Sequence, residues 1–269
     1  MNIIQCQRIG LLILAGGGAT RMQPSLNGRP KALLTIPPWS SVLLDLIIRA
    51  EALSMEVCVA VDGRNYYDIE SYLTYHHQRV DYSVDDGFGT AAAITNAIQR
   101  MRAPFVLVCN ADTIVPVDIL QLAQEYRQYW PFLQVLTPNS TQNAGLIGVE
   151  DDRFGGRIAH WGEHIASPPA RRLVAASSSG AYIINRNYWL NDIDLNANSL
   201  ERDIMPVIVS TSSVEALIIK TDLPVYDYGT IKRFRLLEAN PDLLERLFNA
   251  FGAQQTPSSA CYLDEVHAA

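Results

Sequence analysis

The amino-acid sequence predicts an α/β fold in one domain, with a mixed, mostly parallel central sheet flanked by helices. Three short apolar runs, at Ile9–Ala15, Glu56–Asp62 and Ala103–Asp112, are continuous rather than alternating, which is typical of strands buried on both faces of a parallel sheet. Helix-length patterns lie between these runs, at Ser41–Leu53 and Thr90–Met101. This alternation of strand and helix along the chain indicates βαβ units.

The remaining elements follow in order along the chain. Further strands are expected at Phe132–Pro138, Gly145–Glu150, Gly155–His164 (a turn leading into a strand), Ser179–Arg186 and Glu215–Asp222. Helices are expected at Ser199–Val209 and Asn240–Phe251. Because no internal repeat or clear linker interrupts the pattern, residues 1–252 are predicted to form one domain. Residues 253–269 carry Gln, Ser and Pro, and we expect this tail to be poorly ordered.

Composition and charge exclude several classes of function. The net charge is -7 at pH 7 with a pI near 5.2, which argues against a nucleic-acid-binding surface, because such surfaces need clustered Lys and Arg. The cysteines are widely spaced, without a C-x-x-C pair, and are interpreted as reduced core thiols. No apolar stretch approaches the length of a membrane span and no signal peptide is recognisable, so a cytoplasmic protein without a membrane partner is expected.

A glycine-rich segment follows the first predicted strand. Gly16, Gly17 and Gly18 have no Cβ, so backbone N–H groups there can approach a phosphate or a base closely. Arg21 and Lys31 then add a planar fork of donors and a compact charge. Neither the G-x-G-x-x-G dinucleotide motif nor the G-K-[ST] ending of a P-loop fits this segment. The alternative is a tight turn with solvated basic residues, but the added cations favour a phosphate-binding role.

The whole segment AGGGATRMQPSLNGRPKALLTI, from Ala15 to Ile36, resembles the signature of sugar-1-phosphate nucleotidylyltransferases, L-A-G-G-x-G-T-R-L-x-P followed by P-K-P-L-L-P-I. It departs from that signature at Ala19, Met22 and Ala32. The resemblance extends to about residue 237 and implies a Rossmann-like sandwich of the GT-A-like type. It also implies that Ala15 and the three glycines bind nucleotide, and that heptose-1-phosphate guanylyltransferases and cyclitol-phosphate enzymes are the most similar branches.

Two aspartates are candidate magnesium ligands. Asp112 ends the third apolar run, and Asp227 follows another apolar stretch just before Gly229. Ligands bind at the carboxyl ends of parallel strands, and Mg²⁺ on a nucleotide is held by one or two carboxylates plus phosphate oxygens. Either residue alone could be an ordinary turn or cap aspartate, as we interpret Asp62. The resemblance supports the metal role, because N-A-D and Y-D-Y-G-T are similar to the two metal-binding motifs of the family.

Two further segments resemble the base-binding and sugar-binding parts of that family. DDGFGTAAAITNAIQ, from Asp85 to Gln99, is similar to its P-x-G-T-A-x-A-I element, and the resemblance places Gly87, Gly89 and Thr90 around the nucleobase. Thr90 also suits the start of a helix, and both interpretations can hold together. On the acceptor side the resemblance implies a set of sugar-binding residues: Gly145, Glu163, His164 and Gly180.

His164 is the main departure from the family pattern, because a lysine normally stands there. A histidine is only partly charged near neutral pH. Either a protonated His164 contacts the phosphates, or Lys220, Arg157 or Lys232 replaces the missing lysine, or activity is lowered. An exposed histidine without any role is equally compatible with the residues. Glu201 and Asp203 of the S-L-E-R-D segment are interpreted as structural or cap residues.

The resemblance implies an Mg²⁺-dependent enzyme whose substrates are an NTP, with GTP favoured, and a sugar or cyclitol 1-phosphate. The acceptor phosphate attacks the α-phosphorus in line and pyrophosphate leaves, with Arg21, Lys31 and Asp112 as catalytic residues and Asp112 and Asp227 as metal ligands. The alternatives are a cytidylyltransferase for a non-sugar phosphate and a non-catalytic nucleotide-sugar-binding protein. A glycosyltransferase of related fold is disfavoured because no Asp-x-Asp pair precedes Thr113. A homo-oligomer is compatible with the sequence.

Overall fold

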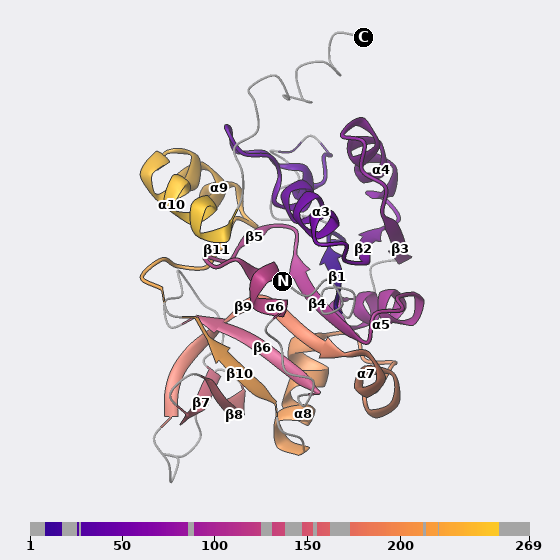
Figure 1. The fold of residues 1–269 in the computed structure, drawn as a ribbon, viewed down its shortest axis with the longest axis vertical. Helices are drawn as coiled ribbons and strands as arrows, with labels where there is room; N and C mark the ends of the chain where they lie inside the picture. Colours follow the sequence, from indigo (N-terminus) through magenta and orange to yellow (C-terminus); the bar gives the residue numbers. More distant parts are fainter. Residues whose placement is uncertain are drawn as a thin grey trace.

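A nine-stranded sheet runs through the molecule in the order β3-β2-β1-β4-β9-β6-β10-β8-β7 (Figure 1). The computed structural model describes residues 9–17, 26, 28–85, 89–124, 131–137, 147–152, 155–161, 173–211, 214–219 and 221–252. The sheet strands are β1 (Ile9–Leu14), β2 (Val57–Asp62), β3 (Asp81–Asp85), β4 (Phe105–Asn110), β6 (Phe132–Thr137), β7 (Ile147–Asp152), β8 (Gly155–Trp161), β9 (Leu173–Asn185) and β10 (Glu215–Ile218).

The first four strands of the sheet order are parallel, as the continuous apolar runs predicted. β1 lies between β2 and β4 and pairs in parallel with both, and β3 pairs in parallel with β2. Leu11 and Ile13 belong to one hydrophobic cluster, whereas Leu12 belongs to the other. Successive side chains of a strand point to opposite faces, so β1 is buried under a layer on each side. This explains why its sequence shows no polar alternation.

Helices form these two layers. The described helices are α3 (Val42–Ala52), α4 (Tyr66–Tyr75), α5 (Thr90–Arg100), α6 (Ile119–Gln124), α7 (Arg186–Asp192), α8 (Met205–Thr211), α9 (Ile231–Glu238) and α10 (Pro241–Phe251). Side chains of α3, α4 and α10 pack in the cluster that contains Leu11, and those of α5, α7 and α8 pack in the cluster that contains Leu12. The predicted helices at α3, α5 and α10 are confirmed, whereas α4, α6, α7 and α9 were not predicted.

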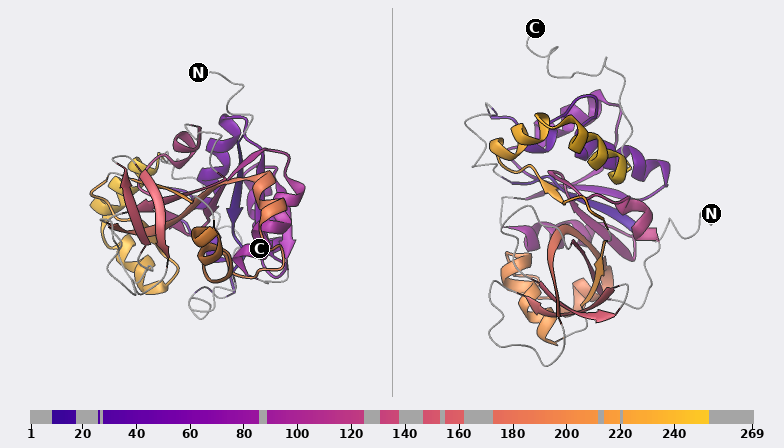
Figure 2. Two further views of the ribbon diagram at one scale, coloured as in Figure 1. Left: turned by 90° about the horizontal axis from the view of Figure 1, so that it is seen from below. Right: turned by 90° about the vertical axis from the view of Figure 1, so that its left-hand side faces the viewer.

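The second half of the sheet closes into a ring of strands, as the right-hand view of Figure 2 shows in its lower part. β9 runs antiparallel to β4 and β6 through its C-terminal part and antiparallel to β7 through its N-terminal part. The ring is completed by β6 with β10, β10 with β8, and β8 with β7. Closure satisfies strand edges that would otherwise expose unpaired backbone groups. The predicted mixed sheet is therefore confirmed, but its closure was not foreseen.

Several predicted elements differ in extent from the structure; the strand expected at Glu215–Asp222, for example, ends at Ile218. β9 begins at Leu173 rather than Ser179. Its first residues, Leu173–Ala176, pair with β7, and Ser177 and Ser178 pair with β6, so partners distant in the chain extend the strand beyond the segment that the local pattern indicated. The helix expected at Ser199–Val209 begins instead as a wide π-type turn over Leu200–Ile204 and becomes regular only in α8. Pro206 follows immediately, and a proline removes one of the N–H groups that a continuous α-helix needs.

The start of this π-type turn is capped as the sequence suggested. Asp203 Oδ2 accepts hydrogen bonds from the N–H groups of Asn198 and Ser199, and these bonds lower the pKa of the Asp203 carboxyl. Glu201 Oε2 accepts a hydrogen bond from the Thr90 hydroxyl. Both acidic side chains thus make local structural contacts, in agreement with their interpretation as structural or cap residues.

Other local predictions concern a turn cap and the cysteine thiols. Asp62 Oδ1 accepts from the Arg64 N–H, which confirms it as a turn cap. Cys58 and Cys109 are free and buried, and burial raises the pKa of each thiol to about 12.

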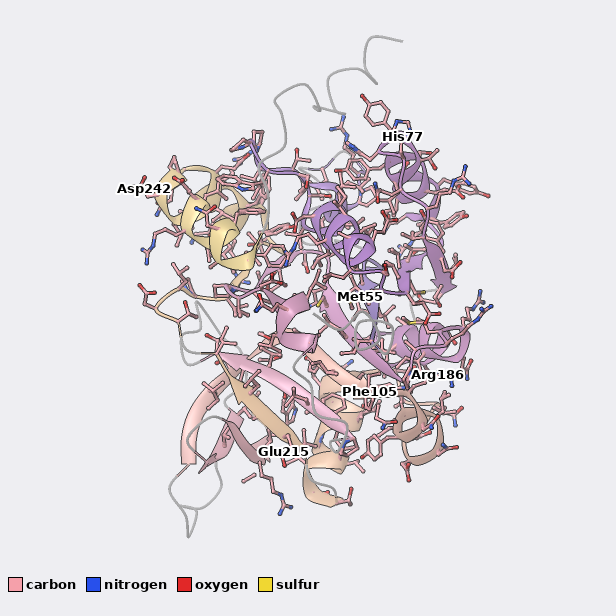
Figure 3. All side chains as sticks on the ribbon, viewed as in Figure 1. Met55, His77, Phe105, Arg186, Glu215 and Asp242 are labelled. Atoms are coloured by element: carbon pink, nitrogen blue, oxygen red, sulfur yellow. The ribbon has the colours of Figure 1, made fainter. Side chains whose placement is uncertain are left out.

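The start of α7 is fixed to β4, since the Arg186 N–H donates to the Pro104 carbonyl beside Phe105 (Figure 3). Among the described residues, no helix is long and apolar enough to cross a membrane.

Candidate functional site

Asp112 and Asp227 are brought together by a small two-stranded ribbon. β5 (Thr113–Ile114) pairs antiparallel with β11 (Tyr226–Asp227), so that Asp227 lies opposite Thr113. The Tyr228 N–H also donates to the Asp112 carbonyl, at 3.1 Å. The two candidate carboxylates therefore share one edge of the ribbon, just beyond the carboxyl end of β4. Sequence reasoning selected both aspartates but not the ribbon, whose strands are too short to give a pattern.

Tyr228 follows β11 directly and stabilises this ribbon. Its ring is almost completely buried, and its hydroxyl donates to the Ala111 carbonyl at 3.1 Å. Burial, followed by the nearby Asp112 charge, raises the pKa of Tyr228 well above its ordinary value. The phenol is therefore neutral at physiological pH and remains a hydrogen-bond donor. Tyr228 thus holds the residues next to both aspartates in a fixed register.

Lys31, which lies in the connection between β1 and α3, reaches Asp112. Its ammonium group forms an ion pair with Asp112 Oδ2, and the two side chains are 25% and 12% exposed, respectively. Lys31 begins a short helical turn whose next residues, Ala32 and Leu33, are buried in the main cluster. Burial of these two neighbours directs the lysine toward the sheet edge. The structure thus unites three residues that the sequence selected from distant segments.

Gly229 marks the space between these side chains. A Cβ atom added to Gly229 would lie 2.7 Å from Asp227 Oδ1, 3.2 Å from Asp112 Oδ2 and 3.4 Å from Lys31 Nζ. The Gly229 N–H donates to Asp227 Oδ1 at 2.6 Å. Two carboxylates that converge on one glycine suit a hard divalent cation such as Mg²⁺. Within the described ranges, no group of three or more His, Cys, Asp or Glu residues is placed to hold a metal ion. An Mg²⁺ ion on the two aspartates would take its other ligands from phosphate or water oxygens.

Gly229→Ala tests this space directly. The backbone of Gly229 is not in the left-handed region, so alanine is conformationally allowed, but its methyl group displaces the ends of the two carboxylates. We expect the affinity for Mn²⁺ with nucleotide to fall roughly tenfold, as expected when fixed ligands move by a few tenths of an ångström. Calorimetric titration measures this. Gly63→Ala is the matched control, since its Cβ would have 3.8 Å to the nearest atom; equal affinities in both variants would contradict the assignment.

The start of the glycine-rich segment lies beside these residues. The Ala111 N–H donates to the Leu14 carbonyl, and the Ala15 N–H donates to the Ala60 carbonyl, which places the end of β1 between the ends of β4 and β2. A Cβ on Gly16 would lie 3.1 Å from the Asp62 nitrogen, whereas one on Gly17 would have nothing within 4 Å. Gly16 is therefore required by packing, and Gly17 faces open space. Gly18 and Arg21 lie outside the described residues.

The residues predicted around the nucleobase contact a neighbouring loop. Gly89 has φ +106°, and a Cβ there would lie 2.3 Å from the Asn198 carbonyl oxygen, so only glycine fits. The Thr90 hydroxyl accepts from the Leu200 N–H at 3.0 Å while it donates to Glu201. In this structure both residues thus join α5 to the segment before α8. Their role toward a base stays a prediction, and Gly87 lies outside the described residues.

Of the predicted sugar-binding residues, Gly180 is the one within the described part of the chain, and it lies beside Asn110. It has φ +75°, and a Cβ there would lie 2.6 Å from Asn110 Nδ2, at the end of β4 that leads to Asp112. Ser178 Oγ accepts from the Gly180 N–H at 3.1 Å and from Gln134 Nε2 at 2.9 Å. The other predicted sugar-binding residues, Gly145, Glu163 and His164, lie outside the described residues, as does Lys220.

Arg233 is a residue of this site that sequence reasoning missed. Its Nη1 donates to Asp227 Oδ2 at 2.8 Å. The available signal was its position shortly after the Y-D-Y-G-T motif, six residues beyond the expected metal-binding carboxylate of Asp227. Of the other cations considered as replacements for the family lysine, Lys232 lies exposed in the same first turn of α9 and Arg157 lies exposed on β8.

Part of the chain that carries this site matches a known protein family. The model of the MobA-like NTP transferase domain matches residues 11–179, which is more than half of the chain and contains the glycine-rich segment, Lys31 and Asp112. The chain belongs to this family. Of the two candidate metal ligands of this NTP transferase domain, Asp112 lies within the matched residues and Asp227 lies beyond them.

Known proteins similar to this NTP transferase domain include mannose-1-phosphate guanylyltransferases from two organisms. The mannose-1-phosphate guanyltransferase of Aspergillus fumigatus is 25% identical over 76% of this chain and 57% of that protein. The mannose-1-phosphate guanylyltransferase of Mycobacterium tuberculosis is 22% identical over 82% of this chain and 58% of that protein. The chain thus spans a little over half the length of these relatives.

Two solved structures show the same fold. The inositol-1-phosphate CTP transferase from T. maritima superimposes with a TM-score of 0.68 and 12% identity, covering 90% of this chain and 97% of that one. A putative glucose-1-phosphate thymidylyltransferase from Bacillus anthracis superimposes with a TM-score of 0.67 and 16% identity, covering 93% and 98%. At these identities the likeness establishes the fold alone, and it confirms the predicted nucleotidyltransferase architecture.

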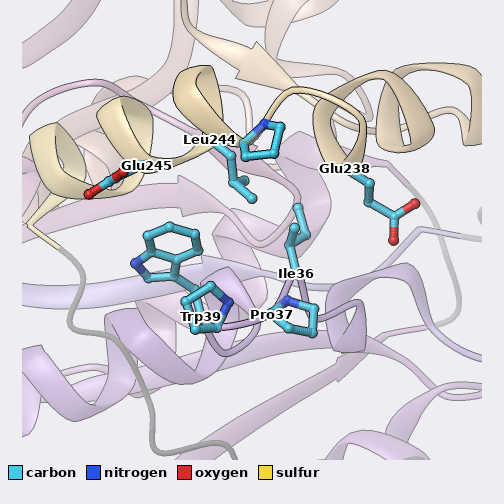
Figure 4. Close-up of a pocket in the computed structure, with 8 residues that line it drawn as sticks. Ile36, Pro37, Trp39, Glu238, Leu244 and Glu245 are labelled. Carbon is cyan, nitrogen blue, oxygen red and sulfur yellow. The ribbon is translucent and has the colours of Figure 1, made fainter.

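A separate groove of this NTP transferase domain does not suit a nucleotide. It has a volume of about 490 Å³ and lies between the turn at Ile36–Trp39 and the start of α10 (Figure 4). Its walls are apolar, with Glu238 and Glu245 as its charged lining residues. Carboxylates without a cation repel a triphosphate, and none of the predicted site residues lines the groove. The site at Gly229 therefore remains the candidate nucleotide site.

Proposed function

We propose that this protein is a sugar-1-phosphate nucleotidylyltransferase, which joins an NTP to a sugar or cyclitol 1-phosphate and releases pyrophosphate. The observation that carries the proposal is the convergence of Lys31, Asp112 and Asp227 around Gly229. Membership of an NTP transferase family supports it. GTP is the favoured nucleotide, because the relatives that match in sequence are mannose-1-phosphate guanylyltransferases.

The proposed reaction needs positioning and charge neutralisation more than proton transfer. A phosphate monoester dianion is already a nucleophile, so its oxygen attacks the α-phosphorus, the α–β bridging P–O bond breaks, and pyrophosphate leaves with the electron pair. Asp112 and Asp227 are the residues that would hold Mg²⁺, which when bound neutralises charge on the α-phosphate. Since Lys31 already contacts Asp112, phosphate oxygens next to Asp112 come within reach of its ammonium group.

The remaining roles extend this arrangement. Arg21 and Lys31 hold the β- and γ-phosphates and stabilise the leaving pyrophosphate, as fixed charges aimed at a developing negative charge do. Ala15 and Gly16–Gly18 accommodate the nucleotide, together with Gly87, Gly89 and Thr90 at the base. Gly180, which lies beside Asn110 at the end of β4, lets the acceptor approach from the ring of strands. Gly145, Glu163 and His164 complete the acceptor side.

A screen of pyrophosphate release tests the proposal. Purified protein with Mg²⁺ is incubated with each of the four common NTPs and a panel of sugar, cyclitol and non-sugar phosphates. We expect release with at least one sugar or cyclitol 1-phosphate, with GTP giving the highest rate. Release only with CTP and a non-sugar phosphate would assign the alternative cytidylyltransferase function. NTP binding without release from any acceptor would instead assign a nucleotide-sugar-binding protein.

A further inference from the structure

The candidate metal site is internally neutralised by two cations that come from different elements. Lys31 pairs with Asp112, and Arg233 pairs with Asp227 through Nη1 and Oδ2 at 2.8 Å. The other oxygen of Asp227 accepts the Gly229 N–H. Both oxygens of this carboxylate are therefore engaged by protein donors before any ligand is present. A metal ion that binds Asp227 through Oδ2 would meet an oxygen already paired with the guanidinium group, whose positive charge opposes the binding of a second cation.

The backbone of Arg233 is held in place at both of its polar groups. The Arg233 N–H donates to Thr230 Oγ1 at 3.3 Å, and the Tyr226 hydroxyl donates to the Arg233 carbonyl at 2.9 Å. Tyr226 and Asp227 are the two residues of β11. The strand that carries the metal ligand thus also fixes the helix that carries the competing cation. Because its backbone is fixed in this way, Arg233 has its guanidinium group held close to Asp227.

The charges around α9 point the same way. Its first turn contains no acidic residue, and Lys232 and Arg233 stand there instead. Cations near a helix N-terminus are disfavoured by the helix dipole, so this turn needs an anionic partner. Asp227 supplies that partner in the present structure. A triphosphate is a stronger anion and can receive both Arg233 and Lys31 when the metal takes their carboxylates.

We propose that Arg233 is a positioning residue that keeps Asp227 paired until a metal–nucleotide complex arrives, so that the metal binds with the nucleotide rather than alone. The exchange conserves charge: the divalent cation replaces two protein cations at the carboxylates, and the phosphates take up the released ammonium and guanidinium groups. This inference rests on the proposed function, since it assumes a metal at Asp112 and Asp227.

Mn²⁺ binding to the nucleotide-free protein tests the proposal without any measurement of turnover. Arg233→Gln should bind free Mn²⁺ roughly tenfold more tightly than the unmodified protein, as expected when a unit positive charge is removed beside a divalent cation in a solvent-accessible site. Free Mn²⁺ is measured by electron paramagnetic resonance during titration. Arg233→Lys should restore weak binding in part. Adding Asp227→Asn to Arg233→Gln should abolish the gain.

Arg235→Gln is the matched control, because it lies exposed on the same helix and changes the net charge equally. Equal Mn²⁺ affinities in Arg233→Gln and Arg235→Gln would overturn the proposal. If turnover in the pyrophosphate screen still depends on Asp227, the proposed function survives that result. If Mn²⁺ binding is independent of Asp227 with and without GTP, the metal site itself is refuted and the role of Arg233 is refuted with it.

Discussion

Asp112→Asn should lower kcat by roughly 10²–10³, the loss found when one group aimed at a transition state is removed. The amide keeps the shape of the side chain but loses the charge that holds a divalent cation. The Asp112 side chain is only 12% exposed. The substitution leaves the backbone carbonyl of residue 112 in place, so this carbonyl should still accept the Tyr228 N–H. We therefore expect the ribbon of β5 and β11 to persist and the thermal unfolding transition to remain cooperative.

Pyrophosphate release with the best substrate pair of the screen measures this effect, and circular dichroism reports the fold. Asp222→Asn provides the matched control, because Asp222 is 82% exposed and pairs only at the surface with Arg246. Such exposed pairs contribute little to stability, so the control should retain full activity. Near-normal turnover of Asp112→Asn in a folded protein would remove Asp112 from the mechanism.

Lys31→Ala should cause a loss of similar size, roughly 10²–10³ in kcat, because it removes a fixed cation from the leaving pyrophosphate. The helical turn at Lys31–Leu33 is held by the buried Ala32 and Leu33, so the truncation should leave the chain folded. Because Lys31 and Asp112 contact each other, the double variant should lose less than the product of the two single losses.

Arg246→Ala controls for the removal of a cation, since this side chain is 58% exposed and lies in a surface pair. Initial rates at saturating substrate separate kcat from KM. A Lys31→Ala protein that changes KM alone would show that Lys31 contributes only ground-state binding. Full additivity with Asp112→Asn would show that the two residues act independently, against the contact seen here.

The sequence predicted those parts of the fold whose signal is local. Leu11, Leu12 and Ile13 are buried on both sides, so the run itself indicated a central parallel strand. β9 was recognised only from Ser179 onward, because its first residues are held as a strand by pairing with β7, a partner that lies more than twenty residues earlier in the chain. Likewise α9 carries cations in its first turn and lacks an acidic start signal, so its N-terminus was not apparent.

The candidate site divides in the same way. Asp112, Asp227, Lys31 and the glycine-rich segment were identified from residue type and from their position at strand ends. Gly229 and Arg233 could be placed in the site only from the structure, because their roles depend on their distances to Asp227 Oδ1 and Oδ2. Neither distance has a counterpart in residue spacing.

The amino-acid sequence by itself determined that this protein has a parallel α/β core, a glycine-rich segment after its first strand and two acidic strand ends, because each of these depends on neighbours in the chain. Only the tertiary structure decided that the second half closes into a ring and that Lys31, Asp112, Asp227 and Arg233 meet in one neutral cluster. Strand pairing and ion pairing between distant segments depend on how the chain packs, and that packing decides which charges face each other.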